Sequence, residues 1–116
     1  MITYGSGVHW AVDVCAELNI QADIIDLRTL LPIDWETIKT SVSKTGKAII
    51  LHEDTLTGGI GGEIAAYIGE HLFEKLDAPV IRIGSLDTPV PFSIPLEQNF
   101  LPKERFKMAL DKLMKY

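Results

Sequence analysis

The feature that most constrains the fold is an apolar strand pattern that leads through a glycine-rich turn into a helix. The run Ala48-Ile49-Ile50-Leu51 is apolar without alternation, which is typical of a central strand covered on both faces. Four glycines follow, at positions 58, 59, 61 and 62. Apolar residues then recur at Ile60, Ile64, Ile68 and Leu72, and this spacing predicts a helix packed on a sheet.

Glycine-rich turns between a strand and a helix often bind phosphate, but this turn lacks the motifs for that role. The fingerprint G-x-G-x-x-G fails because its last position, counted from Gly59, falls on Ile64, and no Gly-Lys-Ser/Thr follows for a P-loop. Glu63 already places a carboxylate at the positive end of the helix dipole. We therefore expect these glycines to allow close backbone packing and positive φ angles.

Strand-like and helix-like segments alternate along the chain, which is the pattern of an α/β fold with a parallel sheet. We predict strands at 2–4, 22–27, 47–52 and 79–84. We predict four helices. The first spans 8–18, and the second runs to residue 45, with Asp34 as its N-cap and Gly46 ending it. The third follows the glycine turn, and the fourth runs from Pro102 to Lys115. Right-handed crossovers then give a three-layer α/β/α fold with a doubly wound, mainly parallel sheet ordered 2-1-3-4.

Size and charge limit the kind of protein. We interpret 1–116 as one domain, and because Met1 leads at once into the strand-like Ile2-Thr3-Tyr4, we expect a piece excised from a longer chain. The net charge of −5 disfavours nucleic acid and anionic membranes as partners. No apolar run approaches the roughly 18 residues of a membrane span. The single cysteine, Cys15, fits the apolar face of its helix, so we expect a small core residue in a reducing cytoplasm.

The reversal of strand order between the first and third strands predicts a crevice at their carboxyl ends. Ser6 and His9 should lie there beside His52, Glu53 and Asp54. We expect the two histidines to approach each other across this crevice. Zinc is the weaker hypothesis, because no spacing marks three or four ligands. Bonds to the backbone, or contact with a neighbouring domain, explain both histidines more simply.

Two further polar residues fall near this edge. Arg28 follows the second strand, so we expect it to pair with Glu53, with Asp54 or with another subunit. An exposed pair of this kind contributes less than about 1 kcal/mol. Ser6 lacks the Gly-x-Ser-x-Gly context of a nucleophile, so we predict that it caps the following helix.

A proline-stiffened segment near the C-terminus is a candidate docking element. We expect 87–92 to be extended, because each proline fixes its own φ and restricts the preceding residue. The candidate docking residues are Asp87, Pro89, Pro91 and Phe92. A basic partner could be received by the acidic side chains of Glu53, Asp54, Glu63, Asp87 and Glu97. A merely solvated acidic face is equally compatible with the sequence.

Several stretches match a known pattern in chain order. They are Ile2-Thr3-Tyr4-Gly5, Asp26-Leu27-Arg28-Thr29-Leu30-Leu31-Pro32-Ile33-Asp34, His52-Glu53 with Thr57-Gly58-Gly59-Ile60-Gly61-Gly62-Glu63-Ile64, and Asp87-Thr88-Pro89-Val90-Pro91-Phe92 with Pro95-Leu96-Glu97. Together they resemble the C-terminal domain of the transketolase family. The resemblance is closer to the β subunit of the decarboxylating component of 2-oxoacid dehydrogenase complexes, with the branched-chain (2-oxoisovalerate) type favoured over the pyruvate type. Gly62 departs from the pattern, since alanine is expected there.

The resemblance implies an assembly role. In that family thiamine diphosphate and Mg²⁺ lie between two other domains, and the chain has no Gly-Asp-Gly followed by an Asn pair to hold them. We therefore expect no cofactor, no metal and no catalytic residue in this domain. The resemblance also implies a homodimer, contacts with the remaining domains and subunits of the parent enzyme, and docking of the lipoyl acyltransferase component through its small basic binding domain.

Two other functions remain open. One is a small-molecule-binding regulatory α/β domain that uses the crevice between the first and third strands. The other is a flavodoxin-type electron-transfer module, which is disfavoured because the loop after the first strand lacks a phosphate cradle.

Overall fold

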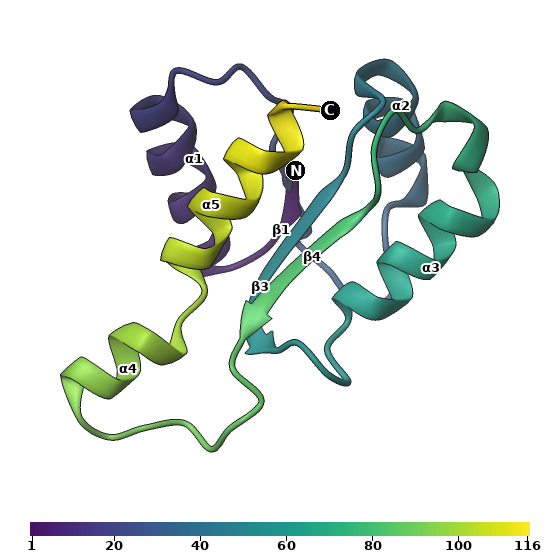
Figure 1. Ribbon diagram of the computed structural model, residues 1–116. Helices are drawn as coiled ribbons and strands as arrows, with labels where there is room; N and C mark the ends of the chain where they lie inside the picture. The colour runs from purple at the N-terminus through teal and green to yellow at the C-terminus, as the bar shows by residue number, and fades with distance from the viewer.

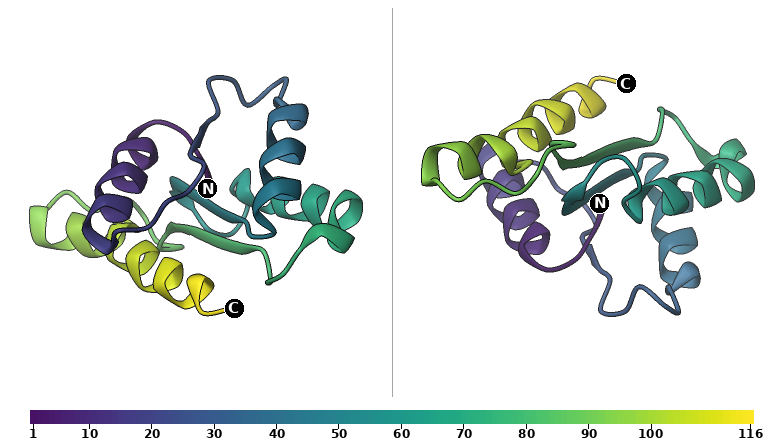
Figure 2. Two further views of the ribbon diagram at one scale, coloured as in Figure 1. Left: turned by 90° about the horizontal axis from the view of Figure 1, so that it is seen from above. Right: turned by 90° about the horizontal axis from the view of Figure 1, so that it is seen from below.

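The computed structural model describes residues 1–116. Its elements are β1 (Ile2–Thr3), α1 (Ser6–Leu18), β2 (Ile25–Asp26), α2 (Trp35–Thr45), β3 (Ile49–Thr55), α3 (Gly61–His71), the 3-10 turn η1 (Phe73–Lys75), β4 (Ile81–Ser85), α4 (Ile94–Phe100) and α5 (Lys103–Met114). All strands are parallel, in the order β2-β1-β3-β4, so the predicted topology is confirmed. The helices α1 and α5 cover one face of the sheet, and α2 and α3 cover the other (Figures 1 and 2).

Alternation along β3 builds the core on both faces of the sheet. Ile49 and Leu51 pack with residues of α1 and α5, including Phe106, whereas Ile50 packs with residues of α2 and α3, including Ile64. Successive side chains of a strand point to opposite faces, so one apolar run supplies both cores. The predicted burial of Cys15 is also confirmed. None of the helices is long and apolar enough to cross a membrane.

The helix ends follow the predicted signals in α2 but not in α1. The Asp34 carboxylate accepts a hydrogen bond from the backbone N–H of Thr37 at 3.0 Å, and Gly46 ends the helix with φ of 67°. In α1 the N-cap is Gly5, with φ of 56°, and no side chain caps the helix. The prediction that Ser6 is the cap is therefore wrong. The helix starts earlier than predicted, and Ser6 is its first residue.

The segment between β4 and α5 differs most from the sequence-based expectation. Residues 87–92 are not continuously extended, because the backbone bends at Asp87 and Thr88 and again at Phe92. The short helix α4, with Pro95 in its first turn, was not predicted. We call Leu86–Leu101 the arm. It projects from the body of the domain below the carboxyl end of the sheet (Figure 1).

Candidate functional site

The carboxyl ends of the strands are organised around a buried histidine. His52 is 0% exposed, and three glycines surround its ring. A β carbon built on Gly59 would lie 2.6 Å from Cε1, one on Gly61 would lie 2.6 Å from Nε2, and one on Gly84 would lie 2.9 Å from Cε1. The predicted packing role of the glycine turn is thereby confirmed, and only Gly58 of this turn has a positive φ, 80°.

One nitrogen of His52 has a partner and the other has none. Nδ1 lies 3.0 Å from the carbonyl oxygen of Asp54. A carbonyl only accepts hydrogen bonds, so Nδ1 carries the proton and Nε2 is an acceptor. Nε2 is buried without a hydrogen-bond partner at the start of α3. Tyr4 lies nearby, with ring centroids 6.4 Å apart, and burial, followed by the charges of Asp54 and Glu53, raises the pKa of its phenol.

The expected approach of His9 to His52 is wrong. His52 follows the alternation of β3 and lies on the same face as Ile50, under α3. His9 belongs to α1, which covers the opposite face, and it is exposed. No group of three or more His, Cys, Asp or Glu side chains is arranged to hold a metal.

A groove lies beside β1 and β2, and His52 is not among the residues that line it. It has a volume of about 590 Å³, and its lining includes Tyr4, Gly5, Ser6, His9 and Arg28. Arg28 does not pair with Glu53 or Asp54. Its Nε lies 2.7 Å from the carboxylate of Asp26 at the end of β2, and its side chain is 87% exposed. Asp26 is only two residues away, so the guanidinium is satisfied locally before it can reach β3.

The glycine turn is tied to the arm through a second contact. Asp87 accepts hydrogen bonds from the backbone N–H of Thr57 at 2.9 Å and from its hydroxyl at 2.6 Å. These bonds, the hydroxyl first, lower the pKa of the Asp87 carboxyl. The backbone N–H of Leu56 also donates to the carbonyl of Ser85 at 3.2 Å. Asp87 therefore anchors the arm to the body, and its carboxylate is already engaged.

The glycine turn does not fit the diphosphate of thiamine diphosphate. The inner faces of Gly59 and Gly61 are filled by the His52 ring, so they leave no room to cradle a diphosphate. Glu53, Asp54 and Glu63 are exposed around the turn, and their charges would repel a phosphate.

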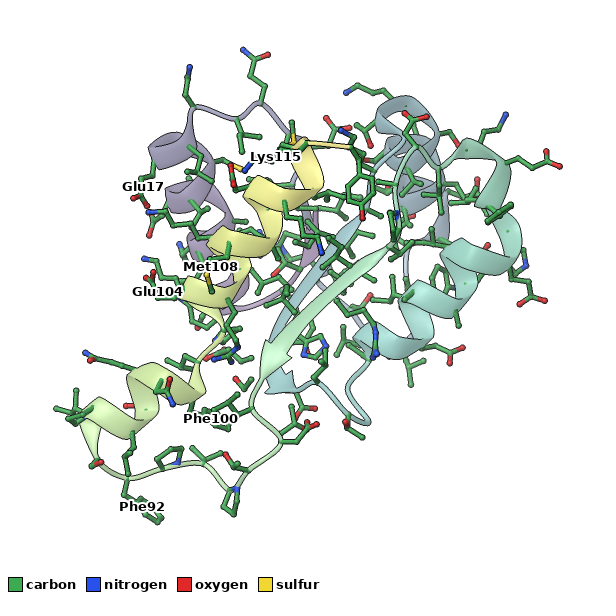
Figure 3. The ribbon with its side chains drawn as sticks, in the orientation of Figure 1. Glu17, Phe92, Phe100, Glu104, Met108 and Lys115 are labelled. Carbon is green, nitrogen blue, oxygen red and sulfur yellow. The ribbon has the colours of Figure 1, made fainter.

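The arm exposes an unusual amount of apolar surface. Val90, Phe92, Ile94 and Leu96 are all exposed, and Phe92 is fully so. Figure 3 shows Phe92 at the far side of the arm, turned away from the body, whereas Phe100 points back toward the sheet. The candidate residues Asp87 and Pro89 are exposed and Pro91 is half-buried. The arm contains no lysine, arginine or histidine.

Comparison with known proteins decides the family. The family described as "Transketolase, C-terminal domain" matches residues 1–105. The chain belongs to the transketolase C-terminal domain family. A solved structure titled "Split gene transketolase, inactive beta4 tetramer" has the same fold as this transketolase C-terminal domain, with a TM-score of 0.79 over 98% of this chain and 37% of that chain at 24% identity.

Curated relatives of this transketolase C-terminal domain carry two kinds of name. The 2-oxoisovalerate dehydrogenase subunit beta of Pseudomonas aeruginosa is 46% identical over 78% of this chain, and that of Bacillus subtilis is 38% identical over the whole of this chain. The pyruvate dehydrogenase E1 component subunit beta of Rickettsia bellii is 39% identical over 90% of this chain. The chain spans only 26%, 37% and 33% of these three relatives. The resemblance predicted from the motifs is confirmed.

Proposed function

We propose that this chain is the C-terminal assembly and docking domain of the β subunit of a branched-chain 2-oxoacid dehydrogenase, and that it has no activity by itself. The parent enzyme would use thiamine diphosphate and Mg²⁺, held by other domains, to decarboxylate a branched-chain 2-oxoacid and pass the acyl group to lipoyl. We further propose that the parent is a homodimer in the cytoplasm. The similarity to 2-oxoisovalerate dehydrogenase subunits over most of this chain supports the choice of substrate class.

The exposed arm is the observation that carries the docking role. Four of its large apolar side chains are exposed close together in the sequence, and apolar surface gathered on one part of a folded domain commonly marks an interface. Phe92 is the natural anchor, because large aromatic side chains supply most of the energy at such contacts. The partner we propose is the lipoyl acyltransferase component, through its small basic binding domain.

The charge around the arm favours a basic partner. Neither Glu53 nor Asp54 takes part in any of the ion pairs of this chain, and both are exposed at the edge from which the arm projects. The arm adds Glu97 and no positive charge. Complementary charge speeds association and selects partners, while the apolar anchor supplies affinity.

Calorimetric titration with that basic binding domain tests the proposal. The matched variants are Phe92→Ala and Met108→Ala, since Met108 is also an exposed apolar residue but lies on α5, away from the arm (Figure 3). Phe92→Ala should weaken binding by roughly tenfold or more, and Met108→Ala should leave it unchanged. Absence of binding by the unmodified chain, or equal effects of the two variants, would contradict the docking role.

The inactivity of the isolated domain has its own test. Titration with thiamine diphosphate in the presence of Mg²⁺ should give no heat of binding up to millimolar concentrations. Binding at micromolar concentration would contradict the proposal, because it would place a cofactor site in this chain.

The groove beside β1 and β2 supports a second candidate function, a regulatory domain that binds a small molecule. Tyr4, Ser6, His9 and Arg28 supply polar groups to the groove. A thermal-shift screen with nucleotides distinguishes the two functions, because a ligand of the folded state raises the unfolding temperature. A shift that disappears in Arg28→Ala would favour the regulatory function, and no shift with any nucleotide would count against it.

A further inference from the structure

The hydrogen bonds between the arm and the body lie at the two ends of the arm, which we call its neck: Asp87 on one side, and Asn99 and Phe100 on the other. The backbone N–H of Leu86 donates to the carbonyl of Phe100 at 3.3 Å, so the two ends of the arm lie together. Phe100, the last residue of α4, is buried. Residues 89–98 make no hydrogen bond to any residue outside the arm. The direction in which the arm projects therefore depends on the contacts at the neck.

One side chain joins both sides of this neck. Arg105, in the first turn of α5, donates from Nη1 to the carbonyl of Asn99 at 2.9 Å, and from Nη2 to the carbonyl of Phe100 at 2.9 Å. Nη2 also lies 3.2 Å from the carbonyl of Gly84, in β4 just before the arm. Carbonyls in the last turn of a helix lack intrahelical partners, and α4 has no basic residue there of its own.

We infer that Arg105 is the positioning residue of the arm: its guanidinium fixes the angle between α4 and β4, and so the direction in which Phe92 is presented. Arg105 itself need not touch a partner. An arginine suits this task because its planar fork directs separate N–H groups at several carbonyls, whereas a lysine offers a compact point charge. The consequence for docking rests on the proposed function, but the positioning is a property of this chain alone.

Hydrogen exchange, measured by mass spectrometry on the 116-residue chain, tests the inference. The variants are Arg105→Met, Arg105→Lys and the control Lys103→Met, which removes the exposed ion pair with Asp13 from the same turn of α5. The reporting amides are those of Leu86, Glu97 and Leu101, which are hydrogen-bonded within the arm. In Arg105→Met their exchange should rise about tenfold, in Arg105→Lys by a smaller factor, and in the control not at all, while β3 keeps its protection.

Two results would overturn the inference. One is unchanged exchange of the arm in Arg105→Met. The other is a uniform rise over the whole chain, because Arg105 would then support general stability and not the arm. If Arg105→Met does not fold, the exchange of the same amides is measured in Arg105→Lys, because lysine keeps the charge and most of the aliphatic stem. The exchange experiment uses no binding partner. If Phe92→Ala fails to weaken docking, that result counts against the proposed function, but it does not bear on the role of Arg105 in positioning the arm.

Discussion

Gly59 packs directly against the imidazole of His52, so that a β carbon at position 59 would lie 2.6 Å from Cε1 of the ring and 2.6 Å from the backbone oxygen of Thr55. The glycine turn is thus shaped by a side chain of the preceding strand. The ring of this buried histidine fills space that in many α/β turns is left for a ligand.

Gly59→Ala should lower the free energy of unfolding by about 1–3 kcal/mol, because the new methyl group overpacks a rigid site. The matched control is Gly69→Ala in α3, where a β carbon would meet nothing within 4 Å. That variant should gain up to about 1 kcal/mol from helix propensity. Urea unfolding measures both, and a neutral Gly59→Ala would contradict the packing described for His52.

Asp34→Ala should lower the unfolding temperature by roughly 3–6 °C, because it removes the only side-chain cap of α2. Ser6→Ala at the start of α1 should change it by no more than about 2 °C, because Ser6 makes no capping bond. Calorimetry distinguishes the two positions. Equal losses would mean that Ser6 caps its helix in solution.

Asp87→Asn should destabilise the chain more at pH 7 than at pH 3. The pKa of Asp87 is lower in the folded state than its usual 3.8, so its carboxylate stabilises the fold above about pH 4, and this contribution is lost as the pH falls through the folded pKa. Urea midpoints at the two pH values give the comparison. An equal loss at the two pH values would contradict this role of the Asp87 carboxylate.

Cys15 should react slowly with a thiol reagent in the native state. It is buried against Met1 and α5, and burial raises the pKa of its thiol, which lowers the fraction of reactive thiolate at neutral pH. We expect labelling at least about a hundredfold slower in buffer than in denaturing urea. Comparable rates in the two conditions would show that α1 opens readily.

The sequence predicted the features that depend on local pattern. The apolar run at 48–51, the cap at Asp34 and the stop at Gly46 each act over a few residues, so the strands, helices and sheet order followed. His52 lies two residues after Ile50, so the alternation of β3 places it under α3 and away from His9. The prediction that Arg28 pairs with Glu53 or Asp54 is wrong because Asp26, two residues before it, already pairs with the guanidinium.

The arm could not be predicted in the same way. The helix α4 is short, begins beside Pro95, and shows no apolar stripe of helical period, because most of its side chains face no core. In the sequence alone, Arg105 cannot be distinguished from any other surface cation of an amphipathic helix. Its three carbonyl partners come from β4 and α4, and only the folded chain brings them together.

The strand order also governs how the domain can assemble during synthesis. The apolar stripe of α1, which includes Ala11 and Val14, is covered by Ile49 and Leu51 of β3 and by Phe106 and Leu110 of α5. Those partners leave the ribosome much later than α1 itself. Until α5 has emerged, the part of that face which Phe106 and Leu110 cover remains open to water, so the domain depends on α5 to complete its fold.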